Sequence, residues 1–233
     1  MKKNLKIMLI TLITICMLFV ITGCGKKEET INTEDNEGAL LQETSNNDKE
    51  NSEEEKAEKE LEFSMGEWKD DVYTNDFLGL KFELPEGWSY SSKDEIASMM
   101  NVGVELLNDD QKQLAEVANL NSVYYLVATD SNTGSNLSVM SEKTLVNLTT
   151  DYYINALKTQ LSALESINYT VTGTSKETVG GREYDVLSLN AEVNGVTLLQ
   201  KYYVYKMDKY FVVLIATSTN GDSGFKTMTE AFK

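Results

Sequence analysis

Histidine is absent from this 233-residue chain, and cysteine and arginine are nearly so. Without histidine there can be no Ser-His-Asp triad, no Cys-His dyad and no HExxH zinc site. The two cysteines are Cys16 and Cys24. If Cys16 is removed with an N-terminal signal and Cys24 is modified, neither remains in the mature domain as a thiol nucleophile or a disulfide partner. Arg182 is the single arginine, so bidentate grips on phosphate or carboxylate are scarce.

Acidic residues outnumber basic ones beyond the first residues. Residues 25–64 carry a net charge of −9, and residues 65–233 carry −10. Because phosphate binding needs clustered lysine and arginine, the composition excludes nucleic acid as a partner. Residues 25–64 are polar and almost free of aromatics, a composition typical of a disordered linker. An alternative is a frayed helix over 53–62, supported by Glu–Lys pairs.

The N-terminus has the pattern of a bacterial lipoprotein signal. A short basic stretch precedes an apolar run ending at Ile21, and about 22 Å of helix is too short for the roughly 30 Å hydrocarbon core. Ile21-Thr22-Gly23-Cys24 resembles a lipobox, in which the cysteine is joined to diacylglycerol and becomes the first mature residue. We therefore expect a signal peptide over 1–23, lipid at Cys24, and an extracytoplasmic protein anchored to the bacterial cell membrane.

Residues 65–233 have the composition of a single globular domain. The strands expected first are 68–74 and 78–84, then one from Trp88, and after these 123–129, 136–143, 169–174, 176–179, 184–193, 196–206 and 210–217. Helices are expected after the capping box at Ser92-x-x-Glu95, after Asn108, over 151–164 with Thr150 as the cap, and from Asp222. This order predicts an α+β fold, a mostly antiparallel sheet with helices on its faces.

Several turn motifs resemble those of PsbP-like domains. They include Phe82-x-x-Pro85-x-Gly87-Trp88, Gly181-Arg182-Glu183-Tyr184, the Asn194-Gly195 hairpin and the closing Ala231-Phe232-Lys233. The resemblance covers about 73–233 and implies an α/β/α sandwich, with members that are mostly non-enzymatic. The metal sites of plant members involve histidine, so no catalytic or metal residue can be carried over to this chain.

Four groups of side chains are candidates for a site, and each has a simpler structural interpretation. Asp130 to Asn136 faintly resembles a calcium loop, but its glycine is one residue early and Ser141 replaces the final glutamate, which favours a polar turn. Gly180-Gly181 lacks the lysine of a phosphate loop. The acidic pairs Asp70-Asp71 and Asp109-Asp110 are poorly placed for acid–base catalysis, whether in a strand or at a helix start.

Three tyrosine doublets complete the candidates: Tyr124-Tyr125, Tyr152-Tyr153 and Tyr202-Tyr203. If one tyrosine of a doublet faces outward, it could contact a protein or a glycan, whereas a helix covering it would make it part of the core. The sequence therefore predicts a membrane-tethered, non-catalytic interaction or accessory domain with no cofactor, no metal and an unidentified protein partner. The alternatives are a lipoprotein that binds a small solute or a cation, and a hydrolase that works through carboxylates.

Overall fold

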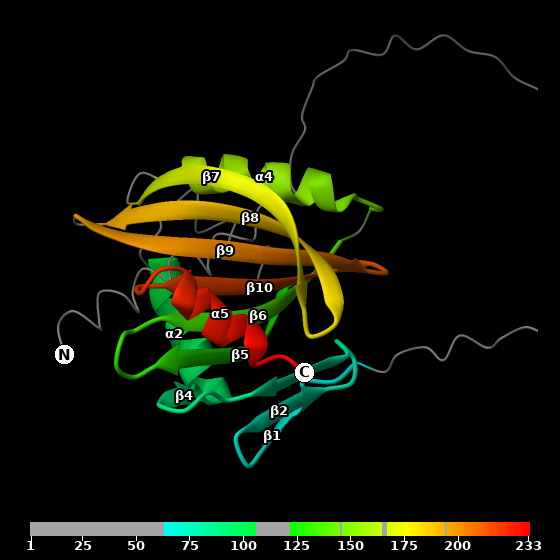
Figure 1. The fold of residues 1–233 in the computed structure, drawn as a ribbon. Helices are drawn as coiled ribbons and strands as arrows, with labels where there is room; N and C mark the ends of the chain where they lie inside the picture. The colour runs from blue at the N-terminus through cyan, green and yellow to red at the C-terminus, as the bar shows by residue number, and fades with distance from the viewer. Residues whose placement is uncertain (1–62, 106–121, 145, 165–166, 194) are drawn as a thin grey trace, which may run out of the picture. The chain divides into compact units, whose positions relative to one another are not determined.

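The computed structural model describes residues 63–233 except 106–121, 145, 165–166 and 194. Its centre is a seven-stranded antiparallel sheet with the order β4-β5-β6-β10-β9-β8-β7 (Figure 1). These strands are β4 (Trp88–Tyr90), β5 (Ser122–Asp130), β6 (Asn136–Lys143), β7 (Asn168–Val179), β8 (Arg182–Val193), β9 (Val196–Met207) and β10 (Tyr210–Ser218). Helices lie on both faces, so the predicted α+β class is confirmed.

A separate three-stranded sheet precedes the main one. It contains β1 (Glu67–Lys69), β2 (Val72–Asn75) and β3 (Leu80–Glu83). The prediction of one strand over 68–74 was wrong, because Asp70 and Asp71 form a two-residue hairpin turn with φ values of 48° and 59°. Aspartate tolerates this left-handed region better than most residues, and positive φ at both central positions matches the twist of a hairpin.

Three helices are described: α2 (Lys93–Glu105), α4 (Thr150–Ser162) and α5 (Asp222–Glu230). The capping box before α2 is confirmed, since the backbone N–H of Ser92 donates to Glu95 at 2.7 Å and that of Glu95 donates to the Ser92 hydroxyl at 3.3 Å. The cap of α4 is Thr149, one residue earlier than predicted, because its hydroxyl accepts from the backbone N–H of Tyr152. The helix expected after Asn108 lies outside the described residues.

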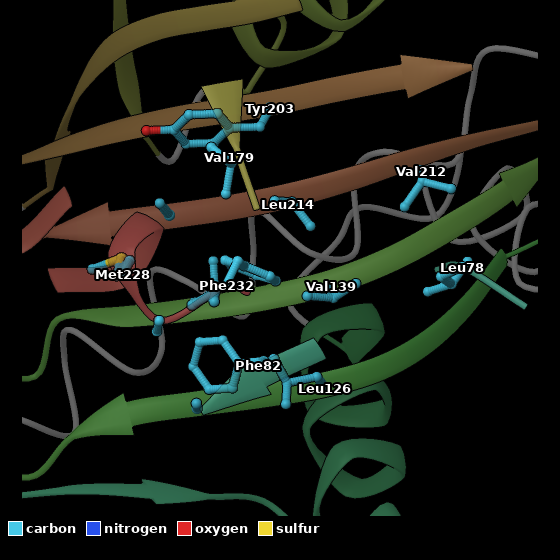
Figure 2. Packing of buried hydrophobic residues seen from close by; sticks show 14 of the residues in the cluster. Leu78, Phe82, Leu126, Val139, Val179, Tyr203, Val212, Leu214, Met228 and Phe232 are labelled. Carbon is cyan, nitrogen blue, oxygen red and sulfur yellow. The ribbon is translucent and has the colours of Figure 1, made fainter. Parts of the chain in front are cut away.

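Two hydrophobic cores form, one on each face of the main sheet. On one face, Ile96 of α2 and Tyr153, Ile154, Leu157 and Leu161 of α4 cover the sheet. On the other, α5 and the small sheet pack together, with Phe82 and Phe232 beside Leu126 and Val139 (Figure 2). Strand β6 is buried at seven of its eight positions, as expected for a central strand covered on both sides.

A β-bulge in β5 determines which tyrosine enters which core. Tyr124 lies opposite Met140 and Leu126 lies opposite Val139, so Tyr125 is the extra residue between them. The side chains of Tyr125 and Leu126 therefore both belong to the core beneath α5, while Tyr124 belongs to the α4 core.

The edge strand at the other end of the sheet is longer than predicted, and its pairing with β8 shifts register between Val171 and Gly173. Strand β7 is continuous over twelve residues, where the sequence suggested two shorter strands, and it forms the edge of the sheet. Gly180 and Gly181 turn the chain with φ values of 56° and 77°, which glycine adopts without the steric cost of a Cβ.

The single arginine joins the two sheets. Arg182 donates from Nη1 to the backbone carbonyl of Leu78 at 2.9 Å, and its guanidinium lies 4.2 Å from the centre of the Tyr205 ring. The Tyr205 hydroxyl donates to the same carbonyl at 2.9 Å. Two strands of the main sheet thus hold the turn before β3, which makes the role of Arg182 structural.

Candidate functional site: the groove beside β7

A groove of about 470 Å³ opens between α4 and the strands β7 and β8. Its lining residues are mostly polar: Asp151, Ile154, Asn155 and Lys158 from α4, Thr174, Ser175 and Lys176 from β7, and Asp185 and Val186 from β8. Figure 1 shows α4 running beside β7 at the end of the sheet. The groove is therefore built from regular elements, which hold side chains in place better than loops do.

The helix presents its polar side to the groove because its apolar side is fixed in the core. Tyr153, Leu157 and Leu161 are almost completely buried, and the ring of Tyr153 lies 4.4 Å from that of Phe211. Asp151, at the start of the helix, and Lys158 are seven residues apart, which corresponds to two helical turns. They line the same groove, so one end of it carries a carboxylate and the other an ammonium group.

On the strand side, one lysine forms ion pairs with two carboxylates. Lys176 Nζ lies 3.0 Å from Asp185 Oδ1 and 3.1 Å from Glu183 Oε1. Hydrogen bonds to Asp185 and Glu183 raise the pKa of Lys176 above its ordinary value. These ion pairs are largely exposed, so they contribute little to the stability of the fold.

Lys158 differs from Lys176 in its surroundings. In the described part of the chain no carboxylate forms an ion pair with Lys158, and its Nζ lies 3.5 Å from the amide oxygen of Asn155. Lys158 is half-buried, and among the described residues of the groove no acid forms an ion pair with it.

One buried carboxyl lies away from the groove. Glu142, on β6, is 1% exposed, and it accepts a hydrogen bond of 3.0 Å from the Tyr153 hydroxyl. Burial raises the pKa of Glu142 to about 7, because the ionised form loses its hydration. A raised pKa often marks a catalytic acid, but Glu142 is not among the groove-lining residues and is enclosed in the α4 core.

The acidic motifs of the sequence form turns. Asp130 Oδ1 accepts from the backbone N–H of Asn132 at 2.8 Å, and Oδ2 accepts from the Thr133 hydroxyl at 2.7 Å. The carboxylate of Asp130 is thus occupied by its own turn, as the simpler interpretation predicted. Among the described residues no group of three or more acidic or sulfur ligands is arranged to hold a metal.

The tyrosine doublets also follow the simpler interpretation. Both tyrosines of the β5 and β9 doublets are buried, because each face of the sheet is covered. In α4, Tyr153 is buried and Tyr152 is 54% exposed, so no exposed tyrosine cluster forms from the doublets.

Two predicted features lie outside the described residues: the lipid attachment residue Cys24 and the acidic pair Asp109-Asp110. In the part of the chain that the structure describes, no helix is long and apolar enough to cross a bilayer.

Sequence reasoning did not identify the groove or Glu142. The groove residues come from three elements, and their proximity depends on how α4 lies against the sheet. A signal for Glu142 was present, since Ser138, Met140 and Glu142 alternate on one face of β6, and the acid occupies an inward position.

Comparison with known proteins gives structural neighbours only. No family model matches the chain, and no curated protein sequence is significantly similar to it. Cyanobacterial PsbP (CyanoP) from Synechocystis sp. PCC 6803 is 13% identical over 70% of this chain and 90% of its own, with a TM-score of 0.45. LpqN, involved in cell envelope biogenesis of Mycobacterium tuberculosis, is 13% identical over 66% of this chain and 82% of its own, with a TM-score of 0.37.

A protein of unknown function from Pseudomonas aeruginosa, PA94, described as a putative regulator, is 12% identical. It covers 44% of this chain and 69% of its own, with a TM-score of 0.30. The resemblance to PsbP-like domains that the turn motifs predicted is matched by a PsbP among these neighbours. At this level of identity the likeness concerns the fold alone.

Proposed function

We propose that this chain is an extracytoplasmic lipoprotein, held at the membrane through lipid on Cys24, whose domain binds a partner rather than catalysing a reaction. The lipobox-like Ile21–Cys24 and the apolar run before it support the anchor. Residues 25–62 then act as a spacer, and a flexible coil of about 40 residues spans roughly 35 Å.

The observation that carries the binding function is the groove beside β7. Strand β7 is an edge strand, most of its residues are exposed, and the groove opens next to it. An extended segment of a partner protein can lie along such an edge, because an edge strand offers unpaired backbone donors and acceptors.

Binding is favoured over catalysis by the chemistry of the available groups. The carboxyl whose pKa is near neutrality, Glu142, is shut inside the core, where a substrate could not reach it without displacing α4. Histidine and a mature-domain thiol are missing from the sequence, and these are the commonest bases and nucleophiles.

A second candidate function, binding of a small solute, is favoured by the size of the groove. A volume of about 470 Å³ lies within the range of roughly 300–1,000 Å³ typical of ligand sites. The lining is polar, which favours a polar solute over an apolar one.

The proposal is tested by affinity capture from detergent-solubilised membranes with the full-length lipoprotein. Thr174→Trp places a bulky ring at the groove, and Thr170→Trp makes the same change at an exposed position of the same strand outside it. We expect the partner that the unaltered protein captures to be lost with Thr174→Trp and retained with Thr170→Trp. Equal capture by both variants would contradict the assignment of the groove as the binding face.

A further inference from the structure

We infer that the first turns of α4 are a proton-controlled wall of the groove, which opens when the buried carboxyl of Glu142 ionises. The inference rests on the proposed function of the groove and concerns the regulation of that same site. It follows from the position of α4, because this helix lines the groove with one side and covers Glu142 with another.

The two roles of α4 fall on neighbouring residues of its first turns. Asp151, Ile154 and Asn155 line the groove. Tyr153, which lies among them in the sequence, is completely buried, and its hydroxyl donates to Glu142 at 3.0 Å. Backbone hydrogen bonds join residues four apart in a helix, so Tyr153 cannot leave the core without moving the groove residues beside it.

Glu142 is an unusual side chain for the position that it occupies. It is 1% exposed, and it lies opposite Ser122 of β5 and Phe211 of β10, neither of which carries a charge. In the described part of the chain no lysine or arginine forms an ion pair with it. Because a buried charge without a counter-ion is costly, the carboxylate form must regain contact with water.

The other ionisable groups on this face do not offset that cost. The core itself contains three tyrosines, one from α4, one from β5 and one from β9: Tyr153, Tyr124 and Tyr202. Lys206 lies on β9 beyond Phe211, and its Nζ donates to the backbone carbonyl of Leu148 at 2.8 Å, just before α4. The charged residues in the first turn of α2 are exposed: Lys93, Asp94 and Glu95.

Moving α4 is the least disruptive way to bring water to this carboxyl. The strands on either side of Glu142 are joined to β6 by backbone hydrogen bonds, whereas α4 is held to the sheet by side-chain packing. Local openings of this kind occur well below the free energy of global unfolding. The inference therefore places the opening in α4 and not in the sheet.

The direction of the pH dependence follows from the two states of the carboxyl. With α4 closed, burial raises the pKa of Glu142 to about 7, and with α4 open the carboxyl returns to its ordinary value of 4.5. The open state thus binds a proton less tightly, so opening becomes easier as the pH rises from about 4.5 to about 7 and is level above that range. Between pH 6 and pH 8 the equilibrium constant for opening should rise about tenfold.

The test is hydrogen–deuterium exchange, followed by mass spectrometry, of the full-length lipoprotein in detergent micelles at pH 6 and pH 8. Each exchange rate is divided by the intrinsic chemical rate at the same pH. We expect the corrected rate of the α4 amides to rise about tenfold in the unaltered protein and to stay constant in Glu142→Gln. Helix α5, on the opposite face of the sheet, is the internal reference and should not respond.

Glu230→Gln, an exposed change on α5, is the matched control and should show the same tenfold rise in α4 as the unaltered protein. A corrected α4 rate that does not change with pH would overturn the inference, as would an equal rise in Glu142→Gln. An equal rise in α5 would also overturn it, because the whole domain would then be opening. The exchange experiment needs no partner, so its failure and a failure of the proposed function in the capture experiment are distinguishable.

Discussion

Replacing Glu142 by glutamine should make the protein more stable at neutral and alkaline pH. The carboxyl is enclosed by the α4 core, where it accepts a hydrogen bond of 3.0 Å from the Tyr153 hydroxyl. Burial raises its pKa from 4.5 to about 7, so the folded protein binds a proton more tightly than the unfolded chain does.

The sign and size of the effect follow from this difference. Because the folded-state pKa is the higher one, the free energy of unfolding falls as the pH rises from about 4.5 to about 7, and it is level above that range. At about 1.4 kcal/mol per pKa unit, the loss amounts to about 3 kcal/mol. Glutamine cannot ionise, and its carbonyl oxygen can accept the same hydrogen bond from Tyr153.

The assay is urea denaturation of the mature chain at a series of pH values between 5 and 8.5, followed by tryptophan fluorescence. We expect Glu142→Gln to match the unaltered protein near pH 5 and to exceed it by about 2–3 kcal/mol at pH 8. Glu230→Gln, at an exposed position of α5, controls for the loss of one surface charge. Parallel pH profiles for Glu142→Gln and the unaltered protein would refute the reasoning.

Three further predictions concern the anchor, the linker and the joint between the sheets. Cys24→Ala should release the protein from membranes or leave it unprocessed, and fractionation that finds a normally cleaved variant still in membranes would contradict the lipid anchor. Deleting 25–62 should leave the melting temperature unchanged, because that segment has no apolar face. The deletion stops before Phe63, whose ring lies 5.4 Å from that of Phe77. A fall of several degrees in the melting temperature would show that the linker packs against the domain. Arg182→Lys should lower the free energy of unfolding by about 1 kcal/mol, because it loses the fixed contact with Leu78, and an unchanged urea midpoint would contradict this.

The sequence predicted most strands correctly because their signals are local. The run from Val123 to Thr129, the polar turn before Asn136 and the glycine turn at Gly180-Gly181 each specify a conformation without reference to the rest of the chain. The error over 68–74 has a local cause as well, since two adjacent aspartates in left-handed conformation are an uncommon turn.

The candidate site could not be predicted in the same way. Asp151, Lys158 and Thr174 look like ordinary surface residues in the sequence, and they meet only because α4 lies against β7. The buried position of Glu142 depends on α4 in the same manner, since Tyr153 is what covers and binds its carboxyl. The tyrosine doublets of β5 and β9 differ in this respect, because their burial follows once both faces of the sheet are known to be covered.

The central claim, that the groove is where a membrane-held lipoprotein meets its partner, is tested most directly by cross-linking in intact cells. With Cys16 removed and Cys24 lipidated, an introduced cysteine would be the only free thiol of the mature chain. Asn155→Cys lies in the groove, and Thr159→Cys is an exposed position of the same helix outside it. We predict that a thiol-reactive cross-linker captures the partner, in the membrane fraction, from Asn155→Cys and not from Thr159→Cys. Equal capture from both positions, or capture from Thr159→Cys alone, would contradict the account.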